Sequence, residues 1–372
     1  MRRFAALLAV LALAPAAMAD EAPPPQWQGT WRGTIGAIPV HACFSSMGDN
    51  YRKGAYFYLS SKRLIGLDSD EHDGWIERAG KGGAESGRWA LSVSPDGKLR
   101  GEWRGGGKVL PVTLTRSGSA GEQEEGCTSR AFIAPRLQPA KVTLKQAKVP
   151  GLAYSLRTYD VGPLFPEVSL QDFTFVPVQK GDLAILSAIR LQPDKPGGRG
   201  DYASCMQGAI GLTGSDGEYG IDVNPEWATP AFLAVHESTG GFCGGAHPSF
   251  DYERQLWDRQ SGQRVDMARW FLSSAVTPSS DGRAVSVHEI SEDLRTAVLP
   301  YFKADDAECK DAAASQEWWN IGANSKGFVF TPSMPHVIAA CVDDAFVPYA
   351  AVSRFLSILG RKQVARLRDG GW

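Results

Sequence analysis

Residues 231–266 read AFLAVHESTGGFCGGAHPSFDYERQLWDRQSGQRVD, and this stretch sets the expectation for the second half of the chain. It opens with a strand-like apolar run and continues into a second such run at residues 252–257. Between the two runs lie four glycines: Gly240, Gly241, Gly244 and Gly245. Glycine at this density indicates backbone with positive φ, or backbone close to another segment. The stretch therefore predicts an antiparallel hairpin whose widened turn carries Cys243 and His247.

Two groups of short motifs in this half of the chain match one known family. The first is Gly-Gly-Ala-His at 244–247, followed by Asp258, Ser-Gly at 261–262 and a Phe-ending segment at 266–271. The second is Gly-Phe-Val-Phe at 327–330, followed by Val-Pro-Tyr at 347–349. With these motifs, residues 154–360 resemble the RsiV-like extracellular domain, the outer part of lysozyme-sensing anti-sigma factors. The resemblance implies a lysozyme-binding domain. The chain departs from those regulators in lacking a transmembrane helix and a cytoplasmic sigma-binding segment, which argues against direct sigma-factor control.

The first residues predict export. Arg2 and Arg3 precede an apolar run at residues 4–13 that is too short to span a bilayer. Ala17 and Ala19 then offer a small-residue cleavage site, so residues 1–19 are predicted to be a signal peptide. No later stretch is apolar enough for a membrane span. We therefore expect a soluble periplasmic protein.

Composition limits the classes of partner. The 372 residues carry 43% hydrophobic and 22% charged residues, which is ordinary for globular protein and suggests two domains. The formal net charge is −2 and there is no basic tract, so nothing favours binding to nucleic acid or to an anionic membrane. No cofactor is expected.

The six cysteines predict disulfide bonds. An even number of cysteines in an oxidising compartment favours three disulfides, although six cysteines allow 15 pairings. If each domain closes on itself, sequence order suggests Cys43–Cys127, Cys205–Cys243 and Cys309–Cys341. No two cysteines have the close spacing of a zinc site, so no metal site is expected.

The N-terminal region has the pattern of a small all-β domain, placed at residues 20–133. Short alternating or aromatic runs are separated by Gly, Asp, Ser and Pro throughout residues 26–116. Tryptophans recur after Gly-x, which favours a small antiparallel barrel or a strongly curved sheet with tryptophans inside. Residues 134–150 contain three prolines and scattered lysines, as expected of a linker.

The second domain, placed at residues 151–360, is predicted to be mixed α+β with an antiparallel sheet. Strands are expected at 172–178, 182–191, 206–212 and 219–223. Ser291 is the predicted cap of one helix. A last helix is expected between Pro348 and Gly360, followed by a frayed tail at 361–372.

Six residues are candidate binding residues: His247, Glu237, Asp251, Trp257, Trp318 and Trp319. His247 stands in the glycine-rich turn, but no spacing fixes a nucleophile or an acid beside it, so no catalytic residue is assigned. Its alternative role is a hydrogen bond to a neighbouring loop. Aromatic side chains suit sugar rings and protein interfaces alike. Adjacent Trp318 and Trp319 cannot both face one core.

These observations favour a non-catalytic periplasmic recognition protein that binds a lysozyme-type cell-wall hydrolase or cell-wall glycan. The alternative is an envelope glycan or peptide hydrolase, because a glycosidase needs only two positioned carboxylates. Acidic residues recur in four short clusters that could attract a basic muramidase. They are Asp68, Asp70, Glu71 and Asp73; Glu122, Glu124 and Glu125; Asp305, Asp306 and Glu308; and Asp343 and Asp344.

Overall fold

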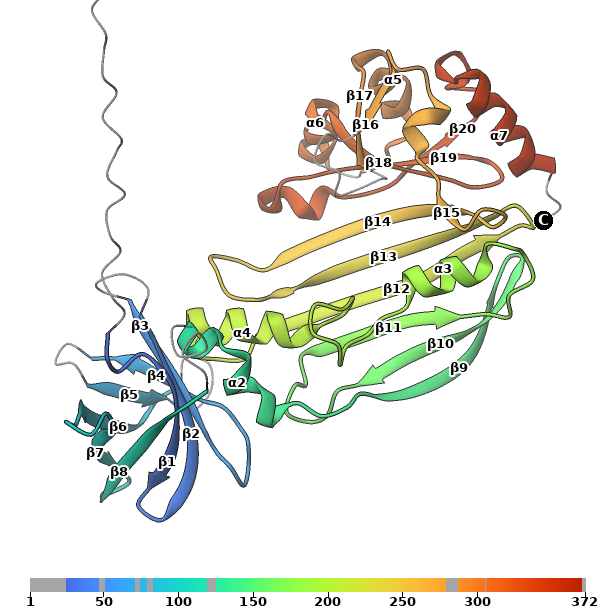
Figure 1. The fold of residues 1–372 in the computed structure, drawn as a ribbon. Helices are drawn as coiled ribbons and strands as arrows, with labels where there is room; N and C mark the ends of the chain where they lie inside the picture. Colours follow the sequence, from blue (N-terminus) through green and yellow to red (C-terminus); the bar gives the residue numbers. More distant parts are fainter. Residues whose placement is uncertain are drawn as a thin grey trace, which may run out of the picture.

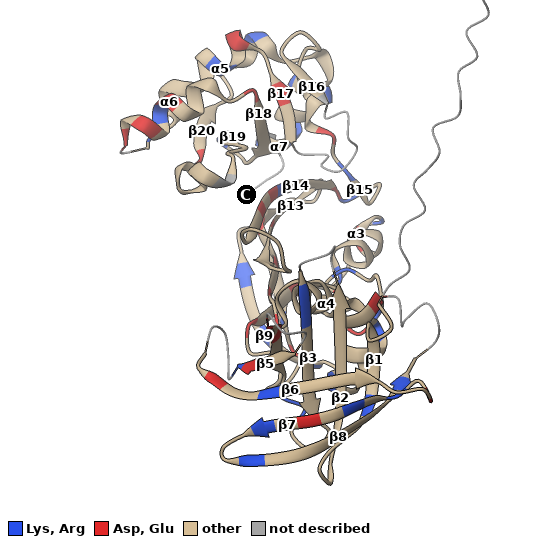
Figure 2. Cartoon of the chain, turned by 90° about the vertical axis from the view of Figure 1, so that its left-hand side faces the viewer, with Lys and Arg blue, Asp and Glu red and all other residues tan. Residues whose placement is uncertain are grey.

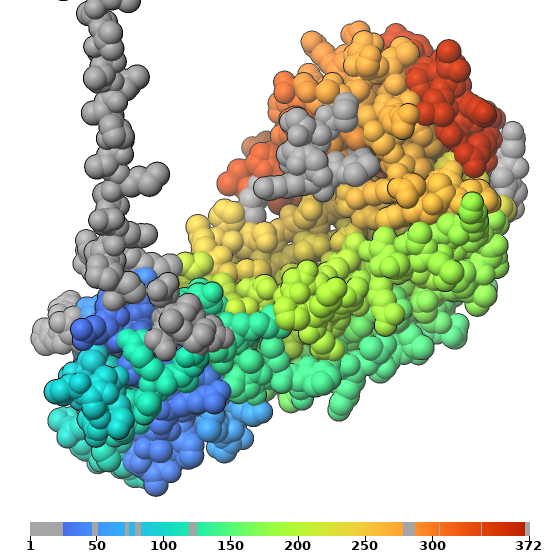
Figure 3. Space-filling model, in the orientation of Figure 1, coloured from blue at the N-terminus to red at the C-terminus, as the bar shows by residue number. Residues whose placement is uncertain are grey.

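The computed structural model describes residues 25–46, 51–70, 74–78, 83–118, 125–278, 287–304 and 306–369. The predicted signal peptide lies outside these ranges. The molecule is elongated: a β-barrel occupies one end, a long sheet the middle, and a second, smaller sheet with its helices the other end (Figure 1). The space-filling view shows the same three parts in sequence order (Figure 3).

The N-terminal region is a closed antiparallel barrel, so the predicted small barrel is confirmed. Its strands are β1 (Gly29–Ile35), β2 (Ile38–Ser46), β3 (Arg52–Tyr58), β4 (Ile65–Ser69), β5 (Trp75–Arg78), β6 (Glu85–Val93), β7 (Leu99–Gly105) and β8 (Lys108–Ser117). Each strand pairs with the next, and β8 pairs with β1. Trp31, Trp75 and Trp89 fill the interior, as predicted. Acidic and basic residues are interspersed on the outside of β6–β8 (Figure 2).

One wall of the barrel shares a hydrophobic core with the rest of the protein. Cys43, Ala55 and Phe57 point out of the barrel and are buried together with Phe132 and Met206. Phe132 belongs to helix α2 (Arg130–Ile133), which the 3-10 turns η1 (Gly126–Thr128) and η2 (Ala134–Arg136) flank. This contact fixes the barrel against the helices that follow it.

A seven-stranded sheet forms the centre of the molecule, in the order β15-β14-β13-β12-β11-β10-β9. Its strands are β9 (Lys141–Val149), β10 (Leu152–Asp160), β11 (Val168–Thr174), β12 (Glu218–Ala228), β13 (Phe232–Phe242), β14 (Ser249–Asp258) and β15 (Gln263–Arg264). Only β11 and β12 pair in parallel. Lys141–Val149 were expected in a linker. They are instead the edge strand β9, paired along its whole length with β10, because the prolines stand only at the ends of this segment.

Two segments predicted as strands are helices on one face of this sheet. They are α3 (Asp182–Ile189) and α4 (Tyr202–Thr213) (Figure 1). Short apolar runs do not distinguish a strand from a buried helix by their pattern alone. Local signals favour the helices: Asp182 lies in the first turn of α3, and Gly214 ends α4 in the left-handed conformation with φ 72°.

In the C-terminal part, the described residues form an antiparallel five-stranded sheet and three α-helices. The strands are β16 (Val276–Pro278), β17 (Val287–Ile290), β18 (Trp318–Ala323), β19 (Gly327–Pro332) and β20 (Ala345–Pro348). The helices are α5 (Glu292–Val298), α6 (Ala307–Ser315) and α7 (Ile358–Asp369), and the 3-10 segments are η3 (Met267–Trp270), η4 (Leu299–Tyr301), η5 (His336–Cys341) and η6 (Ser353–Phe355). The Ser291 hydroxyl accepts a hydrogen bond from the Leu294 amide, so the predicted cap is confirmed.

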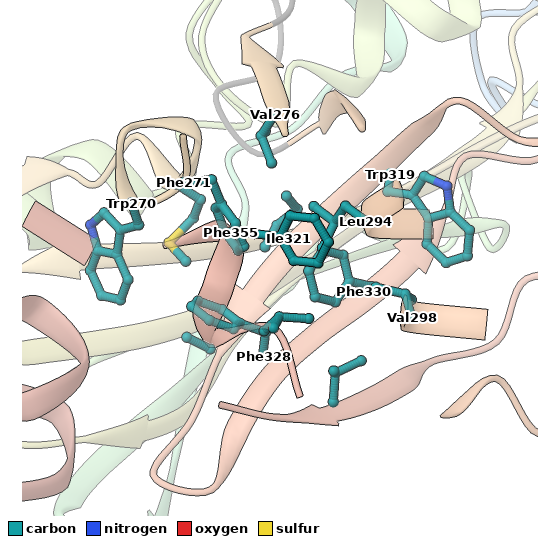
Figure 4. Packing of buried hydrophobic residues seen from close by; sticks show 14 of the residues in the cluster. Trp270, Phe271, Val276, Leu294, Val298, Trp319, Ile321, Phe328, Phe330 and Phe355 are labelled. Atoms are coloured by element: carbon teal, nitrogen blue, oxygen red, sulfur yellow. The ribbon is translucent and has the colours of Figure 1, made fainter. Parts of the chain in front are cut away.

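The core of this part lies between the helices and the sheets (Figure 4). Phe271, Leu294, Ile321, Phe328 and Phe330 are buried there with residues of β13 and β14. The predicted last helix is wrong: the chain makes a short 3-10 turn after Pro348, and the helix begins at Ile358 and runs through most of the supposed tail. Buried Val364 and Leu367 hold α7 on the core.

All three disulfides form as sequence order suggested, with Cys43 bonded to Cys127, Cys205 to Cys243, and Cys309 to Cys341. Such bonds are typical of an oxidising compartment outside the cytoplasm. Within the described ranges, no helix has the length and apolar character needed to cross a bilayer.

Candidate functional site

The glycine-rich stretch is the turned end of the β13–β14 hairpin, as predicted. Gly241, Gly244 and Gly245 have φ angles of 149°, 92° and 107°, whereas Gly240 remains in ordinary strand conformation. The Cys205–Cys243 disulfide ties the turn to helix α4. The turn that carries His247 is therefore anchored to the body of the protein.

Gly241 is required by close approach of the neighbouring strand. A Cβ atom added there would lie 2.0 Å from the Glu218 carbonyl oxygen on β12, whereas one added to Gly245 would meet no atom within 4 Å. We expect Gly241→Ala to destabilise the protein by roughly 2–3 kcal/mol, because strand β12 must move as well as the residue adopting positive φ. Gly245→Ala bears only the backbone strain and should cost about 1 kcal/mol. Urea unfolding of both variants measures the difference. Equal stability of the two would contradict this role for Gly241.

The end of the hairpin and the five-stranded sheet enclose a cavity of about 250 Å³. His247 and Asp251 line it, so the structure brings these two candidates together. Most other wall residues are apolar or aromatic. They are Pro248, Phe250, Tyr252, Val287, Pro332, Met334, Ala339 and Val342, with Ser249, Asn320, Thr331 and Ser333 as further polar members. Phe250 is 62% exposed and lies at the rim.

An arginine network supports the wall of this cavity. The guanidinium of Arg254 binds both carboxylate oxygens of Asp344 at 2.7 Å and one oxygen of Glu226 at 3.0 Å. It also donates to the Thr331 hydroxyl at 3.0 Å, and its backbone amide donates to the Asn320 side-chain oxygen at 3.1 Å. Burial would lower the pKa of Arg254, but Asp344 and Glu226 outweigh burial and raise it. Contacts with Arg254 thus fix the orientation of two polar wall residues, Thr331 and Asn320.

Asn320 presents an unused hydrogen-bond donor at this wall. The residue is 3% exposed, and its Nδ2 atom has no hydrogen-bond partner among the described residues. A buried donor without a partner is costly unless a ligand or water satisfies it. Sequence reasoning missed Asn320 and Thr331, because nothing in the segments around them distinguishes a wall residue from any other strand residue.

His236 and Tyr252 lie beside the same network. Their ring centroids are 4.3 Å apart, and Nε2 of His236 has no partner among the described residues. Burial lowers the pKa of His236, and burial raises the pKa of Tyr252 to about 12. The His236 imidazole is therefore neutral and the Tyr252 phenol protonated near pH 7. Both side chains are uncharged groups that can form hydrogen bonds.

Glu237 and Trp257 lie elsewhere, within a second network. The Glu237 carboxylate accepts hydrogen bonds from Arg199 and, at 2.7 Å, from Gln255. The Trp257 ring is 8% exposed and donates to the Gln255 side-chain oxygen at 3.1 Å. Leu233 and Val235, which alternate with Glu237 along β13, belong to the core beneath the helices. Glu237 and Trp257 are not among the cavity-lining residues.

The tryptophan pair on β18 divides as expected for adjacent strand residues. Trp319 is fully buried and donates to the Gln316 carbonyl at 2.9 Å, whereas Trp318 is partly exposed. Neither lines the cavity. Alternation of side chains across a strand explains this division.

The charges around the cavity are mainly acidic. Asp251 and Asp343 are exposed, and no Lys or Arg is among the described residues that line the cavity. Of the other acidic clusters, Asp68 is paired with Lys53 and Arg78. Glu71, Asp73, Glu122, Glu124 and Asp305 lie outside the described residues. In the part of the chain that the structure covers, no three His, Cys, Asp or Glu residues are grouped to hold a metal ion.

Comparison with solved structures finds partial structural likeness. No family model matches the sequence, and no curated protein matches it. A DUF3298 family member from Bacteroides fragilis is similar in structure, with 12% identity, a TM-score of 0.35, and coverage of 63% of this chain and 98% of that chain. A DUF3298 family protein from Pseudomonas aeruginosa shares 12% identity, with a TM-score of 0.32 and coverage of 59% and 96%. DUF3298 is the family of the RsiV-like extracellular domain.

Proposed function

We propose that this protein is an exported, non-catalytic recognition protein that binds a basic cell-wall hydrolase of the lysozyme type at the hairpin cavity. One observation carries the proposal: the cavity combines apolar walls with the buried donor of Asn320, which has no partner among the described residues, and no Lys or Arg is among its described lining residues. A partner side chain that enters it can bury apolar surface and accept a hydrogen bond. Such central, desolvated contacts supply most of the affinity in protein interfaces.

Charge at the rim supports a basic partner. Asp251 and Asp343 are exposed near the opening, and Asp344 and Glu226 neutralise Arg254 behind it. Many lysozyme-type hydrolases are strongly basic, and opposite charge at the rim would speed association. The net charge of −2 is small, so this attraction must be local.

Cell-wall glycan is the second candidate ligand, and Phe250 and Tyr252 favour it. Phe250 is exposed and Tyr252 is partly buried, and aromatic rings that line a cavity can stack on sugar rings. The alternative to a binding protein is an enzyme, namely a hydrolase of the cell envelope. It would require two positioned carboxylates, and Asp251 is the single Asp or Glu among the described residues that line this cavity.

Calorimetry with the purified mature protein and a basic muramidase tests the proposal. We expect binding at low ionic strength that weakens as salt rises, because rim charges are screened over about 10 Å at 0.1 M salt. Phe250→Ala should weaken binding roughly tenfold, because it removes an exposed aromatic ring that the partner would cover at the opening of the cavity. Val109→Ala, at an exposed position on the barrel, is the matched control and should leave affinity unchanged. Absence of heat with several such hydrolases, together with binding of muropeptides, would replace the hydrolase by glycan as the ligand.

A further inference from the structure

We propose that the outer edge of strand β9 binds an extended peptide segment of a partner protein, in which apolar residues alternate with Asp or Glu. The segment would pair with β9 as an additional antiparallel strand of the central sheet. This site lies in a different part of the molecule from the hairpin cavity and does not depend on the function proposed for that cavity. The inference rests on the outward backbone groups of β9, on a groove beside the strand and on the charge of its side chains.

Strand β9 directs a row of backbone groups away from the sheet. It is the last strand in the sheet order, and β10 is its single partner among the described strands (Figure 1). Val149 and Leu152 flank a two-residue turn, so they form the hydrogen-bonded pair that closes the hairpin. Bonded and non-bonded pairs alternate from there, so the odd-numbered residues of β9 bond to β10. The residues whose N–H and C=O groups point outward are therefore Val142, Leu144, Gln146 and Lys148.

The start of this edge already has the kind of hydrogen bond that an added strand would supply. Ala140 precedes Val142 by two residues and so belongs to the same outward row. Its amide donates to the two oxygens of the Asp194 carboxylate, at 3.0 and 3.2 Å. Beyond Ala140, no described strand or side chain takes the place of Asp194 along the edge. An unpaired row of this kind is a template for pairing with another chain.

An apolar groove opens between helix α3 and the β9–β10 hairpin. Its volume is about 840 Å³, and its apolar lining includes Val142, Leu183 and Leu186. Leu144 follows Val142 on the same face of β9, and the two residues are 62% and 51% exposed. Side chains directly opposite each other in an antiparallel pair point to the same face of the sheet. Every second side chain of the added strand would therefore lie beside Val142 and Leu144 and could bury apolar surface there.

The other face of β9 carries positive charge. Lys141 and Lys145 alternate with the apolar residues and are exposed, and the strand contains no Asp or Glu. The acid opposite Lys141 on β10 is Asp160, whose carboxylate accepts a hydrogen bond from the Gly162 amide at 2.8 Å. The remaining side chains of the added strand would lie on this face beside the lysines. Acidic residues at these alternate positions complement the charge of the edge.

The same lysines disfavour pairing of β9 with a second copy of the chain. Antiparallel pairing of two β9 strands would bring their lysines together, and like charges opposite each other destabilise a sheet. The groove also favours an acidic partner. Arg190 and Lys195 are among its described lining residues, while the lining acid Asp194 is already bonded by the Ala140 amide. Arg157, a third basic lining residue, is paired with buried Asp172.

Fluorescence anisotropy with a labelled synthetic peptide of about eight residues that alternates Val and Glu tests the site on the intact mature protein. We expect saturable binding that weakens as salt rises, and about tenfold weaker binding when Lys replaces Glu in the peptide. Methyl groups on the valine amides should abolish binding, because these N–H groups face β9 in the antiparallel pair. Methyl groups on the glutamate amides, which face away from β9, are the matched control and should leave the affinity unchanged.

Variants of the protein test the same edge. Gln146→Pro removes an outward N–H without removing a bond to β10, and it should weaken peptide binding about tenfold. Gln146→Ala is its control and should leave the affinity unchanged. If the proline variant does not fold, Lys145→Glu should weaken binding of the glutamate peptide about tenfold by charge alone. Lys108→Glu, at an exposed position on the barrel, should not weaken it.

Three results would overturn the proposal. The first is equal binding of the valine-methylated and unmethylated peptides. The second is unchanged affinity in a folded Gln146→Pro or Lys145→Glu variant. The third is a dimer of the parent protein in sedimentation that dissociates in the Gln146→Pro variant, because the edge would then belong to a second copy of the chain.

Discussion

Arg259→Met is expected to destabilise the protein by about 3–5 kcal/mol, because it leaves a buried carboxylate without its partner. Arg259 donates two hydrogen bonds to Asp182, at 2.8 and 2.7 Å, and a third to the Thr229 carbonyl at 2.9 Å. Arg259 is 4% exposed and Asp182 is fully buried. The pair joins the start of α3 to the turn after β14, so its loss weakens the contact of helix and sheet. Urea unfolding at pH 7 measures the effect.

A control and a pH series separate this pair from an ordinary surface pair. Arg104→Met removes an exposed ion pair with Glu102 and should cost at most about 1 kcal/mol. Burial raises the pKa of Asp182, but Arg259 and two backbone amides outweigh burial and lower it. In the parent protein, the ionised Asp182 carboxylate therefore contributes its full stabilisation above the unfolded pKa of about 3.9. This stabilisation is lost as the pH falls through the lower pKa of the folded state. The Arg259→Met deficit should shrink below about pH 4. If Arg259→Met loses the same free energy of unfolding at pH 3 as at pH 7, the loss does not come from the charged Asp182–Arg259 pair.

The parts of the fold that were predicted correctly from the sequence are mainly those with alternating strands and recognisable turn residues. The barrel was predictable because its strands are short, alternate in polarity and are separated by clear turn residues. The hairpin was predictable from glycines, of which Gly241 is demanded by the Glu218 carbonyl. Helix α3 was missed because its apolar run, Leu183–Leu186, is continuous and shows no helical period. Helix α4 was missed although its buried residues, such as Tyr202, Met206 and Ala209, recur at helical spacing.

The candidate site was predictable only in part, since a cavity wall is built from residues distant in sequence. His247 and Asp251 were found because they stand in the glycine-rich hairpin. Asn320 and Thr331 come from β18 and β19 and reach the same wall through the hydrogen bonds of Arg254. No local pattern in the sequence encodes that contact. Trp257, chosen as an aromatic binding residue, fills the core instead, as most tryptophans do.

Glu77→Ala is expected to destabilise the barrel by about 3–5 kcal/mol, since several buried donors would lose their acceptor at once. One carboxylate oxygen accepts hydrogen bonds from the Tyr56 hydroxyl at 2.7 Å and from the Trp103 and Trp89 indoles at 2.8 and 3.4 Å. The other accepts from the Ser86 hydroxyl at 2.8 Å. Burial, and then the charge of Glu77, raises the pKa of Tyr56, so the phenol stays protonated and keeps donating.

Glu77→Gln is the matched control for that loss. Its amide oxygen can replace the acceptor used by Tyr56 and the indoles, while its amide nitrogen faces the Ser86 hydroxyl, which can accept as well as donate. This variant keeps the volume and should cost about 1 kcal/mol, the net value of an ordinary hydrogen bond. Thermal unfolding followed by tryptophan near-ultraviolet dichroism reports on the barrel directly, because Trp89 and Trp103 contact the carboxylate. If the alanine and glutamine variants unfold together, the barrel is held by its apolar packing alone and the carboxylate network contributes nothing.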